Sequence, residues 1–308
     1  MTAHPPPSPL ALAAALAEGP LVLDGGLSNQ LAAAGHDLSD GLWSARLLAD
    51  RPEAIVQAHA AYYAAGAQVA ITSSYQATFE GFARRGIGRA EAAVLLRRSV
   101  ELADRARREA VGDGPRWVAA SVGPYGAMLA DGSEYRGDYG LSVAGLERFH
   151  RPRMEVLAEA GADVLALETV PDAREAEALL RALDGLGVPA WLSYSVDGAR
   201  TRAGQPLAEA FALAAAVDEV IAVGVNCCDP QDVAQAVAVA AEVTGKPVVV
   251  YPNSGETWNA RTRAWEGASR FDSRLVEGWV KAGARLVGGC CRVGPDAISA
   301  AAESLQHH

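Results

Sequence analysis

Short, continuously apolar runs recur along the whole chain at fairly even intervals. They are rich in β-branched residues and lack the alternating polar positions of a strand that has one face in water. This pattern is typical of parallel strands covered on both faces. Eight such runs are present, at residues 21–26, 69–74, 117–124, 163–169, 190–196, 220–227, 247–255 and 284–291.

Segments rich in Ala, Leu and Glu, with apolar residues at helical spacing, lie between these runs. They include residues 52–67, 89–111, 145–160, 172–186 and 231–243, and Ser8-Pro9 predicts one more helix before the first run. Eight strand–helix units in a chain of this length predict a closed (β/α)₈ TIM-type barrel rather than an open sheet. We expect one domain over residues 1–308, with a short N-terminal extension at residues 1–20.

Composition and charge limit the partners and the location that are expected for this protein. Half of the 308 residues are hydrophobic and the formal net charge is −10. An acidic chain without clusters of Lys and Arg argues against nucleic acid and anionic membrane surfaces as partners. The first 20 residues lack the basic start of a secretory signal, and no apolar run is long enough to cross a membrane. A cytoplasmic location is therefore expected.

All four cysteines lie at the ends of two of the apolar runs. Cys227 ends the sixth run and Cys228 follows it directly, and Cys290 and Cys291 end the eighth. Because strand ends meet at one rim of a barrel, Cys227, Cys290 and Cys291 are predicted to bind one soft metal ion, with zinc preferred. Inert buried thiols and a redox dithiol are the alternatives, and Cys228 is expected to be the spare thiol.

Three thiolates leave one position of a tetrahedral zinc ion open, which is the mark of a catalytic site. Sulfur donors make the ion a poor generator of hydroxide but a good partner for a substrate thiol, which it holds as a nucleophilic thiolate. Alkylation of a substrate sulfur is the reaction class that follows.

These residues resemble a known family. Leu23-Asp24-Gly25-Gly26, together with the two cysteine runs, is similar to the zinc-dependent homocysteine S-methyltransferases, a (β/α)₈ family, over nearly the full length. Further stretches resemble the branch that uses S-methylmethionine, and often S-adenosylmethionine, as donor. They are Ser121-Val122-Gly123-Pro124-Tyr125-Gly126, the loop at residues 129–139 and the segment at residues 250–258.

The resemblance implies roles for particular residues. Cys227, Cys290 and Cys291 would hold zinc, with the sulfur of homocysteine as the fourth ligand. Asp24 and Gly25 would hold the amino acid part of homocysteine, and Glu168 would bind its ammonium group. The activity implied is methyl transfer from a sulfonium donor to homocysteine, which gives methionine.

Aromatic faces and carboxylates are candidates for binding the sulfonium cation. The aromatic candidates are Trp43, Tyr75, Tyr135, Tyr139 and Trp258. Glu134 and Asp138 could add negative potential, although a solvated loop explains both equally well. Gln76, next to Tyr75, stands where betaine-using relatives carry an aromatic residue, and this argues against betaine as donor. No cobalamin- or folate-binding portion is expected either.

Three other functions compete with this interpretation. Selenocysteine Se-methylation within the same family fits the same residues, and a non-enzymatic zinc or thiol redox protein would need only the cysteines. A Schiff-base aldolase is disfavoured because Lys246 and Lys281 are not at strand ends. We expect a monomer or a weak homo-oligomer.

Overall fold

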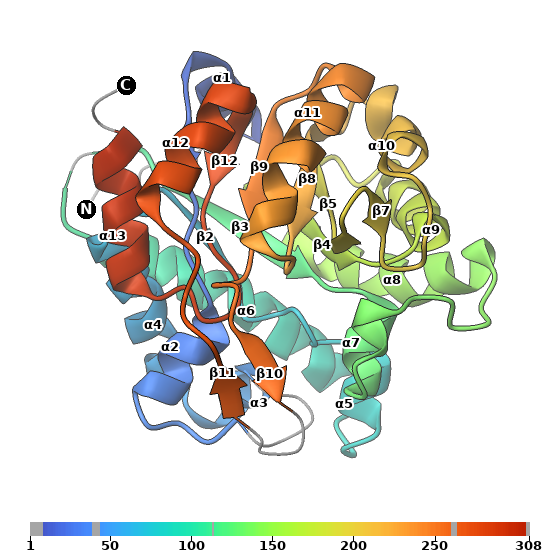
Figure 1. Ribbon diagram of the computed structural model, residues 1–308. Helices are drawn as coiled ribbons and strands as arrows, with labels where there is room; N and C mark the ends of the chain where they lie inside the picture. The colour runs from blue at the N-terminus through green and yellow to red at the C-terminus, as the bar shows by residue number, and fades with distance from the viewer. Residues whose placement is uncertain (1–8, 39–43, 113, 260–263, 306–308) are drawn as a thin grey trace.

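A computed structural model describes residues 9–38, 44–112, 114–259 and 264–305 of the chain. Eight parallel strands form one sheet in the order β1-β12-β9-β8-β5-β4-β3-β2, and a bridge between Leu23 and Val69 joins its two ends. The predicted (β/α)₈ barrel is confirmed (Figure 1). Its strands are β1 (Leu21–Val22), β2 (Val69–Ile71), β3 (Trp117–Val122), β4 (Val164–Val170), β5 (Ala190–Tyr194), β8 (Val220–Asn226), β9 (Val248–Tyr251) and β12 (Ala284–Val287).

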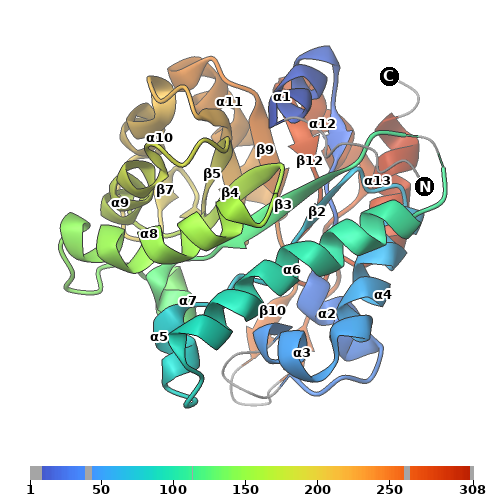
Figure 2. The same ribbon diagram turned by 180° about the vertical axis from the view of Figure 1, so that it is seen from behind.

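Helices surround the strands, as Figure 2 shows from behind. The α-helices are α1 (Pro9–Glu18), α2 (Leu27–Ala33), α3 (Ser44–Asp50), α4 (Pro52–Ala64), α5 (Phe79–Ala83), α6 (Arg89–Glu109), α7 (Tyr125–Leu129), α8 (Val143–Glu159), α9 (Ala173–Leu183), α10 (Leu207–Ala215), α11 (Val233–Thr244), α12 (Ser273–Ala282) and α13 (Pro295–Leu305). Two 3-10 turns, η1 (Ser133–Tyr135) and η2 (Pro230–Asp232), and two short ribbons, β6–β7 (Val196–Asp197, Arg200–Thr201) and β10–β11 (Thr257–Asn259, Ala264–Glu266), lie in the loops. None of the helices in the described part of the chain is both long and apolar enough to cross a membrane.

The apolar core has two layers. The larger layer lies between the strands and the surrounding helices, and the smaller one fills the inside of the barrel. Helix α1 belongs to the inner layer, because Leu12 and Leu16 are fully buried there beside Leu21 and Trp117. The helix predicted from Ser8-Pro9 therefore packs at one end of the barrel, away from the β10–β11 ribbon (Figure 1).

Seven of the eight strands end earlier than the apolar runs predict, and β4 ends one residue later. Strand β12 ends at Val287, so Cys290 and Cys291 lie in the turn that follows. Two glycines make this turn possible. A Cβ atom on Gly288 would lie 2.5 Å from Leu23 Cβ, and one on Gly289 would lie 2.2 Å from Val293 Cγ1. The chain therefore turns while packed tightly against its neighbours, and it delivers both cysteines to the rim.

Candidate active site at the strand ends

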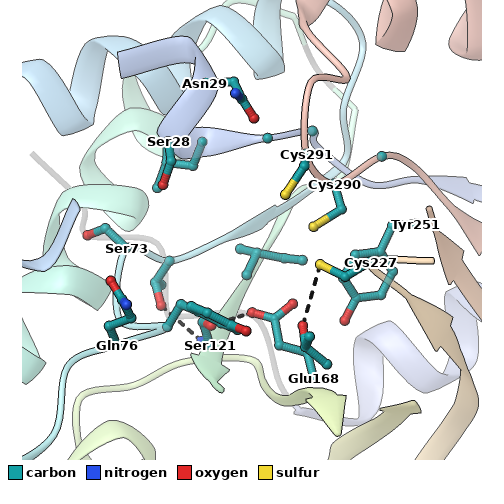
Figure 3. A pocket seen from close by; sticks show the side chains of 18 of the residues that line it. Ser28, Asn29, Ser73, Gln76, Ser121, Glu168, Cys227, Tyr251, Cys290 and Cys291 are labelled. Atoms are coloured by element: carbon teal, nitrogen blue, oxygen red, sulfur yellow. Dashed lines mark hydrogen bonds between the residues drawn. The ribbon is translucent and has the colours of Figure 1, made fainter. Parts of the chain in front are cut away.

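Three of the four thiols meet at the carboxyl ends of β8 and β12. The Sγ atoms of Cys227, Cys290 and Cys291 all lie within 4.8 Å of one another, and Figure 3 shows them facing one another. The predicted convergence is confirmed. A tetrahedral ion with metal–sulfur bonds of about 2.3 Å needs sulfurs about 3.8 Å apart, so this group could hold a metal after a small adjustment.

The three thiols interact strongly with one another. Hydrogen bonds from Cys227 and Cys290 lower the pKa of the Cys291 thiol well below its usual value. Hydrogen bonds with Cys227 and, to a lesser extent, with Cys291 raise the pKa of the Cys290 thiol. Such sulfur-to-sulfur contact in a mostly buried place is what a thiolate metal site requires of its ligands.

Hydrogen bonds donated by three backbone amides hold the cysteine-bearing segments together. The Cys290 amide donates to Pro252 O at 2.7 Å, and the Cys291 amide donates to Asn253 Oδ1 at 3.2 Å. The Cys227 amide donates to Tyr251 O at 3.2 Å. The end of β9 and the loop after it thus hold Cys227, which follows β8, close to Cys290 and Cys291, which follow β12.

Cys228 lies apart from the group. Its side chain is fully buried in the apolar layer between strands and helices. Burial raises the pKa of this thiol, and Cys228 is not one of the three that converge. This placement agrees with its predicted role as the spare thiol.

A small cavity of about 120 Å³ opens beside the sulfurs. This volume suits small molecules rather than a macromolecule. Figure 3 shows part of its wall, with the sulfurs on one side and Ser73 and Gln76 on another. The lining residues are Gly25, Gly26, Leu27, Ser28, Asn29, Ile71, Thr72, Ser73, Tyr75, Gln76, Ser121, Glu134, Tyr135, Glu168, Thr169, Cys227, Tyr251, Gly289, Cys290 and Cys291.

Two of the predicted homocysteine contacts line this cavity. Glu168, at the end of β4, is 5 % exposed and its Oε1 accepts a hydrogen bond from Ser121 Oγ. Burial raises the pKa of Glu168 to about 7, against the opposing effect of the Ser121 bond. Gly25 lines the wall at the end of β1, where a Cβ would lie 2.2 Å from Val293 O.

Asp24 lies behind the cavity wall rather than in it. Its Oδ2 accepts from the Ile71 amide at 2.9 Å, and its Oδ1 is buried without a partner among the described residues. Burial raises the pKa of Asp24, the Ile71 amide opposes this shift, and the charge of Glu168 adds to it. The two carboxylates therefore stand close enough to repel each other.

The aromatic candidates for the donor site separate into three groups. Tyr75 and Tyr135 line the cavity. Tyr139 does not, and its ring packs on Tyr125 with 5.2 Å between centroids. Trp43 and the side chain of Trp258 fall outside the described part of the structure, although the backbone of Trp258 forms part of β10.

Sequence reasoning missed several polar lining residues. Ser121 and Tyr251 lie at strand ends, inside stretches that carried the family resemblance, and Gln76 lies in the loop after β2, where it was used only to argue against betaine. For Glu134 and Asp138 the sequence does not decide between a site role and a solvated loop. The structure separates them, because Glu134 is 4 % exposed in the cavity wall whereas Asp138 is exposed and paired with Arg174.

Comparisons with known proteins agree with this arrangement. The sequence profile described as homocysteine S-methyltransferase matches residues 21–305. Homocysteine S-methyltransferase 4 of Zea mays is 47% identical over 94% of this chain and 90% of its own length. Homocysteine S-methyltransferase of Escherichia coli is 46% identical over 91% of this chain and 93% of its own length.

A solved structure of a homocysteine methyltransferase has the same fold. The metallated form of the homocysteine methyltransferase MmuM from Escherichia coli superposes with a TM-score of 0.86 and 44% identity, covering 96% of this chain and 99% of that one. Fold and sequence thus agree over nearly the whole length, and the chain belongs to the homocysteine S-methyltransferase family.

Proposed function

We propose that this protein transfers a methyl group from a sulfonium donor, S-methylmethionine or S-adenosylmethionine, to the thiol of homocysteine, with zinc held by Cys227, Cys290 and Cys291. The observation that carries the proposal is the meeting of three sulfurs and the buried Glu168 carboxylate in one small cavity. A thiol-bearing amino acid offers matching groups, namely a sulfur for the metal and an ammonium for the carboxylate.

Zinc suits this donor set. Three thiolates favour a soft or borderline ion, and they leave one tetrahedral position for a fourth sulfur. When bound, zinc would hold the substrate thiol in its deprotonated, nucleophilic form. The homocysteine methyltransferase MmuM of Escherichia coli has been solved in a metallated form, and this supports a metal at the corresponding place here.

The remaining residues would bind and orient the acceptor. Asp24 and Glu168 are two buried carboxylates whose charges repel. An ammonium group in the cavity beside Glu168 would relieve this repulsion and form a charge-assisted hydrogen bond with Glu168, whereas Asp24, behind the wall, would act through its charge alone. Gly25 lines the cavity, and its backbone amide would receive the substrate carboxylate.

Tyr75 and Tyr135 would contribute to binding the donor. Both line the cavity, and an aromatic ring face attracts a sulfonium cation. Methyl transfer from a sulfonium to a thiolate reduces both charges in the transition state and removes them in the products. Rate enhancement would therefore come from alignment of sulfur, methyl and sulfur in a site that excludes water.

The decisive experiment combines metal analysis with an assay of methionine formation. Purified protein should contain one zinc per chain and form methionine from homocysteine with S-methylmethionine, S-adenosylmethionine or both. Chelation should abolish turnover, and added zinc should restore it. Parallel reactions with selenocysteine as acceptor identify a selenol methyltransferase if selenocysteine is used far better than homocysteine. Full activity in metal-free protein would overturn the zinc-based mechanism.

A further inference from the structure

A second buried carboxylate in the cavity wall, besides Glu168, is not used by the acceptor site. Glu134 belongs to η1, in the loop between β3 and α8, and it is only 4 % exposed. Its Oε2 atom is buried and has no hydrogen-bond partner among the described residues. An unpartnered buried carboxylate is costly, so this atom calls for a cationic hydrogen-bond donor that arrives with a ligand.

The loop holds Glu134 in a built position. A Cβ atom on Gly126, in α7, would lie 2.4 Å from the Glu134 amide nitrogen, so only glycine lets the turn pack directly on this helix. The Ser133 amide donates to Asp131 Oδ1 at 3.0 Å, and the Arg136 amide donates to Ser133 O at 3.0 Å. The backbone that carries Glu134 is thereby held in place on both sides.

Glu134 reaches the cavity wall from a different part of the chain than Glu168. Glu168 belongs to β4 and is bonded to Ser121 of β3, whereas Glu134 belongs to η1, which packs on α7. Two segments that are distant in sequence therefore each bring one carboxylate to the cavity wall. If the proposed function is right, the cavity must also hold two amino acids at once, and each of these carries one ammonium group.

The chemistry of the reaction decides which cationic group of the donor this carboxylate would suit. A carboxylate against the sulfonium would stabilise the ground state more than the transition state, because the sulfonium charge disappears during transfer. The donor's ammonium keeps its charge throughout, so binding it costs no rate. The ammonium also supplies the N–H groups that Oε2 lacks, which a sulfonium cannot do.

Resting on the function proposed above, we infer that Glu134 binds the α-ammonium group of the methyl donor and so selects sulfonium donors that are amino acids. Glu168 and Glu134 then divide the two substrates between them, one ammonium to each. Simple sulfonium compounds without an amino group would lack this contact.

Two donors and one substitution test the inference. In Glu134→Gln, the KM for S-methylmethionine should rise about tenfold or more, with kcat, the KM for homocysteine and the zinc content nearly unchanged. With 4-(dimethylsulfonio)butyrate, which is S-methylmethionine without its amino group, the unmodified protein and Glu134→Gln should have the same KM. Asp138→Asn is the matched control, because it removes an exposed carboxylate from the same loop, and it should change neither KM.

The possible outcomes are distinct. An unchanged KM for S-methylmethionine in Glu134→Gln overturns the inference, and so does an equal loss with both donors. A rise in kcat together with KM would place the carboxylate against the sulfonium instead. If Glu134→Gln does not fold, the two donors are compared in the unmodified protein alone. Equal KM values for S-methylmethionine and 4-(dimethylsulfonio)butyrate would contradict the assignment. If the unmodified protein forms no methionine, the proposed function fails; calorimetric titration of both proteins with S-methylmethionine then tests the contact without turnover.

Discussion

Asn226 and Thr169 exchange two hydrogen bonds across the rim of the barrel. The Thr169 amide donates to Asn226 Oδ1 and Asn226 Nδ2 donates to Thr169 Oγ1, both at 2.7 Å. Asn226 ends β8 directly before Cys227, and Thr169 Oγ1 lies 3.6 Å from Cys227 Sγ. Cys227 has a φ of +49° and Thr169 has a φ of +57°, values that cost energy for residues other than glycine. The paired side chains hold this strained corner in place and aim the sulfur.

Replacing Asn226 by alanine should therefore weaken the metal site. The Thr169 amide and the hydroxyl of Ser193, which also donates to Asn226 Oδ1, would lose their acceptor. We expect a loss of about 1–3 kcal/mol in the free energy of unfolding. Metal affinity should fall by about 10–100-fold, as is usual when the support of a ligand is removed. Denaturant unfolding and competition with a chelator measure the two effects. Unchanged metal affinity would show that Cys227 needs no such support.

Single replacement of the converging thiols should remove the metal. Cys227→Ser, Cys290→Ser and Cys291→Ser should each purify with little zinc and form no methionine, because a hydroxyl is a poor substitute for a thiolate on a borderline-soft ion. Metal content by mass spectrometry, measured beside activity, checks this expectation. Cys228→Ala is the control and should keep both, losing only about 1 kcal/mol of stability from the apolar layer. A Cys228→Ala protein without metal would contradict the assignment of three ligands.

The barrel and the meeting of the three thiols could be predicted because each depends on short stretches of sequence. Eight apolar runs with helical segments between them leave few alternatives, and parallel strands of a barrel must end at the same rim. That topology brings Cys227 to the same rim as Cys290 and Cys291, and the turn at Gly288 and Gly289 completes their approach. No contact between distant side chains had to be known.

The parts that escaped prediction depend on packing between segments that are distant in sequence. Tyr135 and Tyr139 lie in the same loop, yet the first lines the cavity and the second packs on Tyr125. Glu134 is buried because η1 lies against Gly126, and the sequence gives no distance between them. The pairing of Asn226 with Thr169 joins strands that are not neighbours in the chain, so it too appears only in the folded structure.

The N-terminal helix should contribute to the stability of the barrel. Leu16 is 1 % exposed and packs with the residues inside the barrel, so Leu16→Ala removes apolar contacts that cannot easily be replaced. The expected loss is about 2–5 kcal/mol in the free energy of unfolding, measured with urea. Leu213→Ala, at a side chain that is 37 % exposed in α10, should cost far less. Equal effects would mean that α1 is not part of the folded core in solution.

Substitution of Gly126 can disturb the donor side of the cavity although Gly126 itself does not line it. A Cβ atom there would lie 2.4 Å from the Glu134 amide nitrogen and 2.7 Å from the Ser133 carbonyl carbon. Because these are backbone atoms, the clash cannot be relieved by a side-chain rotation, and η1 must move away from α7. Gly126→Ala should therefore raise the KM for S-methylmethionine severalfold while the zinc content and the KM for homocysteine stay close to normal. Steady-state kinetics with each substrate varied in turn measures this.

Gly278→Ala provides the matched control for that substitution. Gly278 lies inside α12 with no heavy atom within 4 Å of the added Cβ, so alanine there should leave both KM values unchanged. Alanine should also stabilise that helix, by up to about 1 kcal/mol. A Gly126→Ala protein that binds the donor normally would show that η1 can shift without consequence. In that case the placement of Glu134 would not depend on its contact with α7. If Gly126→Ala instead loses both donor binding and zinc, the loop supports the whole site rather than the donor side alone.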